Sequence, residues 1–222
     1  MPIRGDSGRC GVRKQNNNDE KAAPAEQPEK KAGRRTLTRL DWIDAATEIL
    51  VSKSVDAIHP ATLARDLGIT IGSFYYHFKD RNDLLASVLR QWHERTTAQV
   101  MHEYAGMPID ELAYELMALP LHGLTARHAA MVEFAIRAWA RRDDMARQAV
   151  LEVDQQRLGL YTDALRNSGF AKAEAENRAF LIYSFQMSQA LLWDVNDEKA
   201  RKRQLNFARK LFLQPLGGNV KP

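Results

Sequence analysis

The sequence has only one cysteine, no long hydrophobic run and no short catalytic motif. Because Cys10 has no partner, an intrachain disulfide is excluded. The longest uncharged stretch, residues 179–193, has 15 residues, whereas a bilayer span needs about 20 apolar residues. We therefore expect a buried helix there and no membrane partner. No apolar leader segment and no Asn-x-Ser/Thr site occurs, which favours a cytoplasmic protein.

Motifs that assemble a catalytic or cofactor site are also absent. The chain has no His-Glu-x-x-His, no Gly-x-Gly-x-x-Gly and no phosphate-binding loop. No further His, Cys or carboxylate lies at ligand spacing from His77 along its expected helix. We therefore expect a protein that is not an enzyme and that holds neither a cofactor nor a metal.

The charged residues are unevenly distributed. Residues 1–35 carry nine Lys or Arg and five Asp or Glu, which accounts for the whole net charge of +4, and residues 36–222 carry 23 of each kind. The apolar fraction of 45% and the charged fraction of 27% are ordinary for a folded protein. Since a neutral body does not by itself indicate a nucleic-acid partner, the interpretation depends on local motifs.

The spacing of apolar residues predicts an all-α fold. Residues 1–35 contain no aromatic residue and few large apolar ones, which indicates a flexible basic arm. From residue 37 onward apolar residues recur at helical spacing, and no convincing strand occurs. We expect helices over about 38–53, 60–67, 81–104, 109–119, 126–141, 144–167, 173–194 and 198–212, with a further short helix beginning near Ile71.

Capping residues mark several of these boundaries. The first helix has Thr38 at the N-cap and Asp41 three residues on, and Asp80 and Asp83 repeat this arrangement at the fourth helix. Gly68 supplies the flexible backbone that ends the second helix. The core-facing stripe of the first helix is expected to consist of Leu40, Ile43, Ala46 and Leu50.

Two short helices joined by a tight turn at Gly68, with the first helix behind them, form a helix-turn-helix. This spacing alone is common among helical proteins. The string LARDLGITIGSFYYHFKDRNDLL, residues 63–85, is more specific. It resembles the DNA-binding signature of the tetracycline-repressor (TetR) family in its small-residue turn, its Tyr-Tyr-His-Phe run, and its lysine followed by an acid and Leu-Leu. The resemblance is strongest over about residues 38–92.

The resemblance implies both an architecture and a function. It implies a three-helix, homeodomain-like helix-turn-helix domain over residues 36–80, a C-terminal helical ligand-binding and dimerisation domain over 81–214, and a flexible tail over 215–222. It also implies a homodimeric transcriptional repressor that binds double-stranded DNA at a pseudo-palindromic operator and is released by a small-molecule effector. Two alternatives stay open: a helical protein-interaction module, and a non-specific DNA-binding protein, neither with an inducer.

The expected recognition helix offers small and polar groups to DNA. Gly72 has no side chain at a point where the helix would press against the groove. Thr70 and Ser73 offer hydroxyls to a phosphate or a base edge, and Ile71 offers an apolar contact to a thymine methyl. By position, the resemblance implies further DNA contacts from Thr62, Tyr75, Tyr76, His77 and Lys79.

Neighbouring residues qualify this prediction. Helical spacing turns Phe74 and Phe78 back toward the first helix, so we expect them in the core. His59 stands where the family has a capping Ser or Thr, which puts contacts from the second helix in doubt. Arg34 and Arg35 precede the first helix and favour an arm that enters the minor groove, although a merely solubilising tail fits the composition equally well.

The remaining sequence favours a ligand pocket and a dimer interface. Five of the seven methionines lie in residues 101–145 among aromatic residues, which suits an adaptable pocket, although irregular core packing gives the same pattern. The expected pocket residues are Met101, Tyr104, Tyr114, Met117, Met131, Phe134 and Trp139. A seven-residue leucine repeat in 151–165 and the apolar stretch 179–193 predict a dimer interface formed by the last two long helices. Its expected members are Leu151, Leu158, Leu165, Ile182, Phe185 and Gln189.

Overall fold

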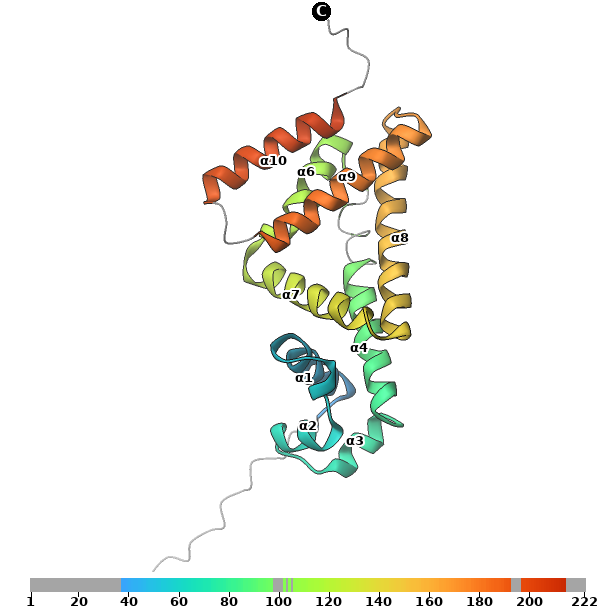
Figure 1. Cartoon of the computed structure of the whole chain (residues 1–222), viewed down its shortest axis with the longest axis vertical. Helices are drawn as coiled ribbons and strands as arrows, with labels where there is room; N and C mark the ends of the chain where they lie inside the picture. The colour runs from blue at the N-terminus through green and yellow to red at the C-terminus, as the bar shows by residue number, and fades with distance from the viewer. Residues whose placement is uncertain (1–36, 98–101, 103, 105, 193–196, 215–222) are drawn as a thin grey trace, which may run out of the picture. The chain divides into compact units, whose positions relative to one another are not determined.

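The computed structural model describes residues 37–97, 102, 104, 106–192 and 197–214, and this part of the chain contains helices and no strand (Figure 1). The all-α prediction is therefore confirmed. The α-helices are α1 (Arg39–Ser52), α2 (Pro60–Asp66), α3 (Ile71–His77), α4 (Arg81–Thr96), α6 (Ile109–Ala118), α7 (Gly123–Ala140), α8 (Asp144–Asn167), α9 (Lys172–Leu191) and α10 (Glu198–Leu213). Two short 3-10 helices are η1 (Val55–Ala57) and η2 (Leu119–Leu121).

Several expected features lie outside the described residues. They are the basic arm with Arg34 and Arg35, the pocket candidate Met101, and the tail over 215–222. The described residues from Leu37 onward form one compact unit. None of the described helices is both long enough and apolar enough to cross a membrane.

The capping residues act as the sequence predicts. The backbone N–H of Thr38 donates to the Asp41 carboxylate at 2.6 Å, and the backbone N–H of Asp83 donates to the Asp80 carboxylate at 2.9 Å. Gly68 follows the C-cap of α2 and adopts a φ of 69°. Glycine reaches this left-handed conformation without steric cost, so the chain can leave the helix at this point. These local interactions fix the starts of α1 and α4 and the turn between α2 and α3.

Three boundary or burial predictions are wrong in detail. Leu40 is half exposed, and Trp42 is the fully buried residue at that end of α1. The α4 helix ends at Thr96 and not near residue 104, because Thr96 and Thr97 return their hydroxyls to carbonyls one turn back. The α7 helix begins at Gly123, three residues earlier than expected, after a turn in which this glycine has a φ of 81°.

The buried side chains form two clusters. One joins α1–α4 to the facing parts of α7 and α8, and the other lies among α6, α8, α9 and α10. Large members of the first are Trp42, Phe74, Phe78, Leu84 and Ile136. Large members of the second are Leu116, Met117, Tyr161, Leu165 and Ile182. The division into a DNA-binding and a regulatory domain stays a prediction, since α8 contributes to both clusters and α7 packs in the first.

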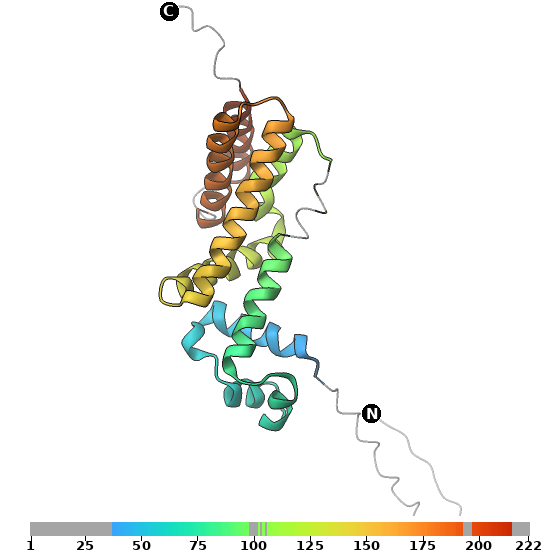
Figure 2. The same cartoon turned by 90° about the vertical axis from the view of Figure 1, so that its right-hand side faces the viewer.

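Helices α4 and α7 connect the two ends of this unit. In Figures 1 and 2, α4 runs from α3 up to α8, and α7 lies between α1 on one side and α6 and α9 on the other. The contacts agree with the pictures, because α1 packs on both α4 and α7, and α8 packs on α4, α7 and α9. A displacement of α7 therefore acts on α1 directly, and a displacement of α8 acts on it through α4 or α7.

Candidate DNA-binding surface and ligand cavity

The α3 helix has one face buried in the core. Phe74 is fully buried and Phe78 is 2% exposed, as the helical spacing predicts. The Phe74 ring meets Trp42 of α1 edge-on at a centroid distance of 5.4 Å and stacks on Phe78 at 5.3 Å. This aromatic packing fixes the rotation of α3 about its axis, and the rotation decides which residues face outward.

The opposite face of α3 carries most of the predicted DNA-contacting residues. Tyr75 is 62% exposed and Tyr76 is 85% exposed, although aromatic residues are normally buried. The exposed members of the predicted set are Thr70, Ile71, Gly72, Tyr75, Tyr76 and Lys79, and Thr62 and Ser73 are partly buried. The surface presents hydroxyls, an ammonium group and one apolar side chain, which are groups that meet phosphates and base edges.

Gly72 is not required by the packing of the protein itself. A Cβ atom built on Gly72 would have Thr70 Oγ1 at 3.8 Å as its nearest neighbour outside the adjoining backbone, an ordinary van der Waals distance. Glycine nevertheless costs helix stability relative to alanine. The structure therefore offers no internal reason for a glycine, which favours a close approach by something outside the chain.

His77 holds a different position from the other predicted DNA contacts. Its Nε2 lies 3.1 Å from the carbonyl oxygen of Leu37, and its own carbonyl oxygen accepts a hydrogen bond from Arg39 Nε at 3.4 Å. One ring nitrogen of His77 is therefore used within the chain, to join the end of α3 to the start of α1. A phosphate contact from His77 stays a prediction.

Two arginines for which the sequence predicted no role hold elements of the fold together. Arg39 donates to Ser87 Oγ at 2.6 Å and stacks over the Phe78 ring at 4.6 Å, so it joins α1 to α4. Arg81 donates to the carbonyl oxygens of Ile58 and Val55, both at 2.6 Å. It therefore fastens α4 to the segment before α2. The sequence carries no signal for these contacts, because each joins residues more than 20 positions apart.

The N-terminal helices match a known protein family. Residues 43–88 match the sequence profile described as "Bacterial regulatory proteins, tetR family". Residues 43–88 are thereby identified as a TetR-type N-terminal segment. The match covers the greater part of α1, all of α2 and α3, and the first half of α4, and it confirms the resemblance seen in the sequence. No curated protein sequence matches the chain.

Solved structures of transcriptional regulators share the fold. A regulator from Rhodococcus sp. is 17% identical with a TM-score of 0.65, and the match covers 84% of this chain and 100% of that one. A TetR-family member from Streptomyces coelicolor is 22% identical, with a TM-score of 0.56 over 78% and 98% of the two chains. FadR from Bacillus subtilis, solved with stearoyl-CoA, is 17% identical, with a TM-score of 0.60 over 81% and 100%. The likeness in fold thus extends into the C-terminal helices.

The residues predicted to form one ligand pocket do not lie together. Tyr104 and Tyr114 line a hollow beside α10, and Met131, Phe134 and Trp139 line a groove between α1 and α7. Met117 is fully buried in the second core cluster. Only Phe134 among the predicted residues lines the cavity described next. The sequence prediction was drawn from residue types, and those types serve core packing at most of these positions.

A mostly apolar cavity of about 200 Å³ lies among α4, η2, α7, α8 and α9. Its space results largely from small side chains, since four of the lining residues are alanines. The residues that line it are Arg95, Thr96, Leu119, Pro120, Ala126, Ala129, Ala130, Glu133, Phe134, Arg157, Gln186, Met187 and Ala190. Its wall is therefore apolar except at the α4 side and at the α8–α9 side.

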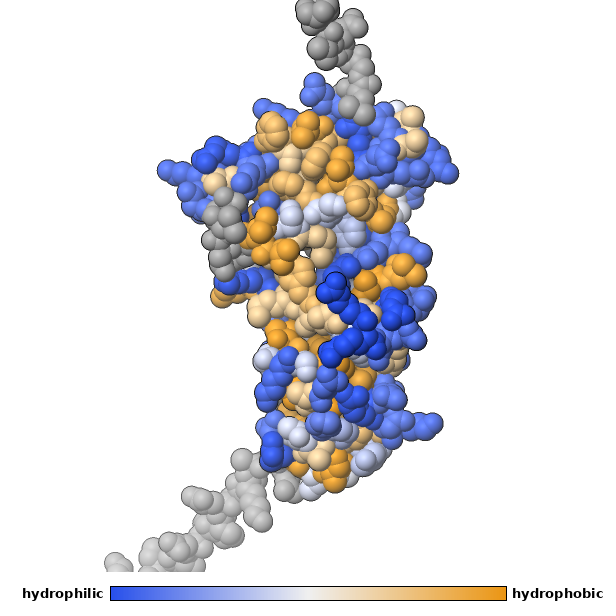
Figure 3. Space-filling model, viewed as in Figure 1, coloured by the Kyte–Doolittle hydropathy of each residue, from blue (hydrophilic) through white to orange (hydrophobic). Residues whose placement is uncertain are grey.

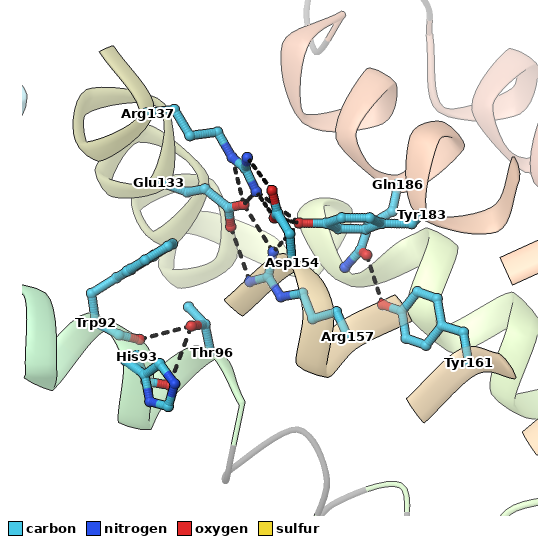
Figure 4. Close-up of polar contacts among 10 residues, drawn as sticks. All are labelled: Trp92, His93, Thr96, Glu133, Arg137, Asp154, Arg157, Tyr161, Tyr183 and Gln186. Carbon is cyan, nitrogen blue, oxygen red and sulfur yellow. Dashed lines mark hydrogen bonds and ion pairs between the residues drawn. The ribbon is translucent and has the colours of Figure 1, made fainter. Parts of the chain in front are cut away.

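A polar network forms the α8–α9 side of this cavity (Figure 4). Arg157 binds Glu133 through two hydrogen bonds of 2.8 and 3.0 Å. Arg137 binds Glu133 at 2.8 Å and Asp154 at 2.5 Å. The Tyr183 hydroxyl donates to Asp154 at 2.6 Å and accepts from both arginines. The network therefore joins α7, α8 and α9.

The network is built from ionised groups whose charges cancel. Burial opposes the charged form of Glu133, but Arg157 and Arg137 outweigh it and lower the pKa of the carboxyl group below its ordinary value. Burial likewise opposes the charge of Asp154, and the hydrogen bonds from Arg137 and Tyr183 lower its pKa. Two guanidinium groups thus face two carboxylates. The sequence held one signal for this cluster, the i,i+4 pair of Glu133 and Arg137 within the otherwise apolar second half of α7.

The residues predicted for the dimer interface divide into exposed and internal ones. Leu165 and Ile182 are buried in the core of the same chain, at 0% and 2% exposure, and cannot also cover a partner. Leu151 is 49% exposed. Leu158 and Phe185 are partly buried against the second core cluster, and Gln189 is 9% exposed. We therefore remove Leu165 and Ile182 from the candidate interface.

Other apolar side chains of the same region are exposed. Phe180, Leu181 and Leu191 of α9 are 60%, 47% and 70% exposed, so the expectation that residues 179–193 form a fully buried helix is wrong for the single chain. Figure 3 shows apolar surface gathered on the face that carries α9. We call the exposed side chains of Phe180, Leu181 and Leu191 the α9 apolar stripe.

Proposed function

We propose that this TetR-family transcriptional regulator is a homodimeric repressor. In this proposal it binds a specific operator through α3 and leaves that operator when a small molecule occupies the cavity among α4, α7, α8 and α9. The observation that carries the DNA-binding part is the outward face of α3, where two exposed tyrosines follow a glycine that the chain's own packing does not require.

The chemistry of α3 supports sequence-specific contact with DNA. The hydroxyls of Tyr75 and Tyr76 and the ammonium group of Lys79 are donors suited to phosphate oxygens, which fix orientation. The smaller groups at Thr70, Ile71 and Gly72 precede them and suit the base edges in a major groove. Because the described part of this domain is not strongly basic, we expect affinity to depend on fitted contacts more than on long-range attraction.

A chain of polar contacts supports coupling between the cavity and α1. Arg95 of α4 lines the cavity, and its guanidinium group lies 3.5 Å from the carboxylate of Asp44 in α1. Gln91, one turn earlier on α4, donates to the same carboxylate at 3.1 Å. His128 of α7 approaches Glu48 of α1 at 3.1 Å. A ligand that displaces α4 or α7 therefore changes contacts that hold the DNA-binding helices.

The α9 apolar stripe supports a symmetric dimer. Large exposed Phe and Leu side chains that recur along one helix favour an association surface. The neighbouring α8 contributes the exposed Leu151. Two α8–α9 pairs would form a four-helix interface with twofold symmetry, and the two α3 helices would then read half-sites about one helical turn of DNA apart or a multiple of it.

A relative's ligand supports the proposed effector. The related FadR structure contains stearoyl-CoA, so this fold accommodates a small molecule in at least that protein. In the present chain the cavity of about 200 Å³ is the counterpart that we propose for ligand binding.

Selection of bound fragments from genomic DNA tests the proposal directly. The purified protein is expected to enrich a pseudo-palindromic sequence and to bind it at least about a thousandfold more tightly than unrelated DNA at the same salt concentration. A ratio near one would favour a non-specific DNA-binding protein. Absence of any DNA binding by a folded dimer would favour a protein-interaction module. Release of the selected fragment by a bound ligand then tests the repressor mechanism.

A further inference from the structure

The size of the cavity limits the ligand to a small molecule. An engineered apolar cavity of about 150 Å³ in another protein binds benzene, and this cavity measures about 200 Å³. Its walls are formed mainly by alanines of α7 and α9 together with Leu119, Phe134 and Met187. These surfaces suit one ring or a short chain and offer few polar partners.

The charges at the polar end are already compensated. Arg157 and Glu133, whose side chains are 10% and 11% exposed, face each other through two hydrogen bonds. Arg137 and Asp154 form the second pair. At the other end Arg95 is 55% exposed and pairs with Asp44 of α1, so its charge is directed away from the apolar walls. A charged ligand would therefore lose its hydration without gaining a free counter-ion.

Gln186 leaves one hydrogen-bonding group unused. Its side-chain oxygen accepts a hydrogen bond of 2.8 Å from the Tyr161 hydroxyl. Burial raises the pKa of Tyr161, so the hydroxyl stays protonated and remains a donor. This bond fixes the amide with its nitrogen on the side away from Tyr161, as Figure 4 shows.

The amide nitrogen of Gln186 has no hydrogen-bond partner among the described residues, although only 7% of the residue is exposed and it lines the cavity. The described side-chain atoms that are fully buried without a partner are the indole nitrogens of Trp42 and Trp92, so the Gln186 nitrogen is not closed off from the cavity. An acceptor atom on a ligand would satisfy it, whereas a further donor would not.

We propose that the cavity binds an uncharged molecule, with a single ring or a short chain, that carries a carbonyl or similar hydrogen-bond acceptor for Gln186. This inference rests on the proposed function, because it names the chemical class of the effector. It does not depend on DNA binding, since the binding of the ligand can be measured on the free protein.

Four probes of nearly the same shape test this proposal on the full-length protein. Acetophenone carries an uncharged acceptor, α-methylstyrene replaces the carbonyl oxygen by a methylene group, benzoate is an anion and benzamidinium is a cation. Melting temperature and calorimetric titration measure binding. We expect acetophenone to bind about tenfold more tightly than α-methylstyrene and both to bind more tightly than either ion. Equal binding of acetophenone and α-methylstyrene, stronger binding of an ion, or no melting shift with any probe overturns the proposal.

Substitutions at Gln186 assign the preference to that residue. Gln186→Leu is expected to lower acetophenone affinity to that of α-methylstyrene and to leave α-methylstyrene binding in place. Gln186→Glu keeps an acceptor for Tyr161 and removes the amide donor, so it is expected to weaken acetophenone as well, which provides a second test if the leucine variant does not fold. Ser184→Leu, at an exposed position of the same helix and outside the cavity lining, is the control and is expected to retain the preference. A preference that survives both changes at Gln186 overturns the assignment.

A parallel measurement with the selected DNA separates this inference from the proposed function. If acetophenone binds through Gln186 but does not weaken DNA binding, the effector class stands and the release mechanism is wrong. If benzoate or benzamidinium binds and releases the DNA, the release mechanism stands and the inferred ligand class is wrong.

Discussion

Replacement of Gly72 by alanine is expected to change stability and DNA affinity in opposite directions. The added Cβ would meet Thr70 Oγ1 at 3.8 Å, so it fits within the chain. Alanine restricts the unfolded backbone more than glycine does, which raises the free energy of unfolding by about 0.5–1 kcal/mol. Against DNA, a methyl group at a filled contact costs about 1–3 kcal/mol, which corresponds to roughly five- to 150-fold weaker binding.

Urea denaturation measures the first effect, and fluorescence anisotropy with the selected operator at fixed salt measures the second. Gly159→Ala is the matched control, because Gly159 lies within α8, far along the chain from α3, and has nothing within 4 Å of an added Cβ. It is expected to gain stability and to keep the affinity of the unchanged protein. A Gly72→Ala protein that is less stable, or that binds the operator as tightly as before, would refute the argument that the glycine serves an external contact.

Further expectations concern the buried network and the dimer. Glu133→Gln leaves Arg157 without its counter-charge and should lower the free energy of unfolding by about 3–5 kcal/mol, measured by urea titration at pH 7; a loss below 1 kcal/mol would contradict the pairing. Because the folded-state pKa values of Glu133 and Asp154 lie below their ordinary values of 4.5 and 3.8, both groups stabilise the fold above those values. The free energy of unfolding should therefore decrease as the pH falls from about 5 toward 3, and less steeply in Glu133→Gln; a flat profile would be inconsistent with ionised, paired carboxylates. Phe180→Asp should convert the dimer to a monomer in sedimentation velocity, whereas Leu124→Asp, an equally simple change at an exposed leucine of α7, should leave the dimer intact; a dimeric Phe180→Asp protein would exclude the α9 apolar stripe as the interface.

The helices and their ends could be predicted from the sequence because their causes are local. Thr38 with Asp41, Asp80 with Asp83, and Gly68 each act within four residues of their own position. The early end of α4 has a local cause as well, in two consecutive threonines that bond back to the helix. The two threonines are visible in the sequence, but the apolar periodicity continues beyond them and predicted a longer helix.

The outward face of α3 was predictable for a related reason. In a helix of seven residues, the burial of Phe74 and Phe78 on one side leaves Tyr75 and Tyr76 on the other. Leu40 shows the limit of this reasoning, because it lies in the expected stripe of α1 and is nevertheless half exposed. Periodicity predicts which residues share a face, and the packing partner decides which face is covered.

The cavity and its polar wall could not be predicted from residue types. Glu133, Arg157 and Gln186 line the cavity from three different helices, and they are 24 residues or more apart along the sequence. Methionine and aromatic residues, which were expected to mark the pocket, fill the two core clusters at most positions. The small alanines that open the space carry no signal in a single sequence, because alanine is common in every helix.

The claim on which the account depends is that the exposed face of α3 binds DNA, and replacement of both Tyr75 and Tyr76 by alanine tests it most directly. Operator affinity is measured by anisotropy, with helicity and sedimentation as checks on folding and dimerisation, and Phe207→Ala serves as the control at an exposed aromatic residue of α10. The account predicts at least about a hundredfold loss of affinity in the double variant and no change in the control. Unchanged operator affinity in a folded, dimeric double variant would contradict it.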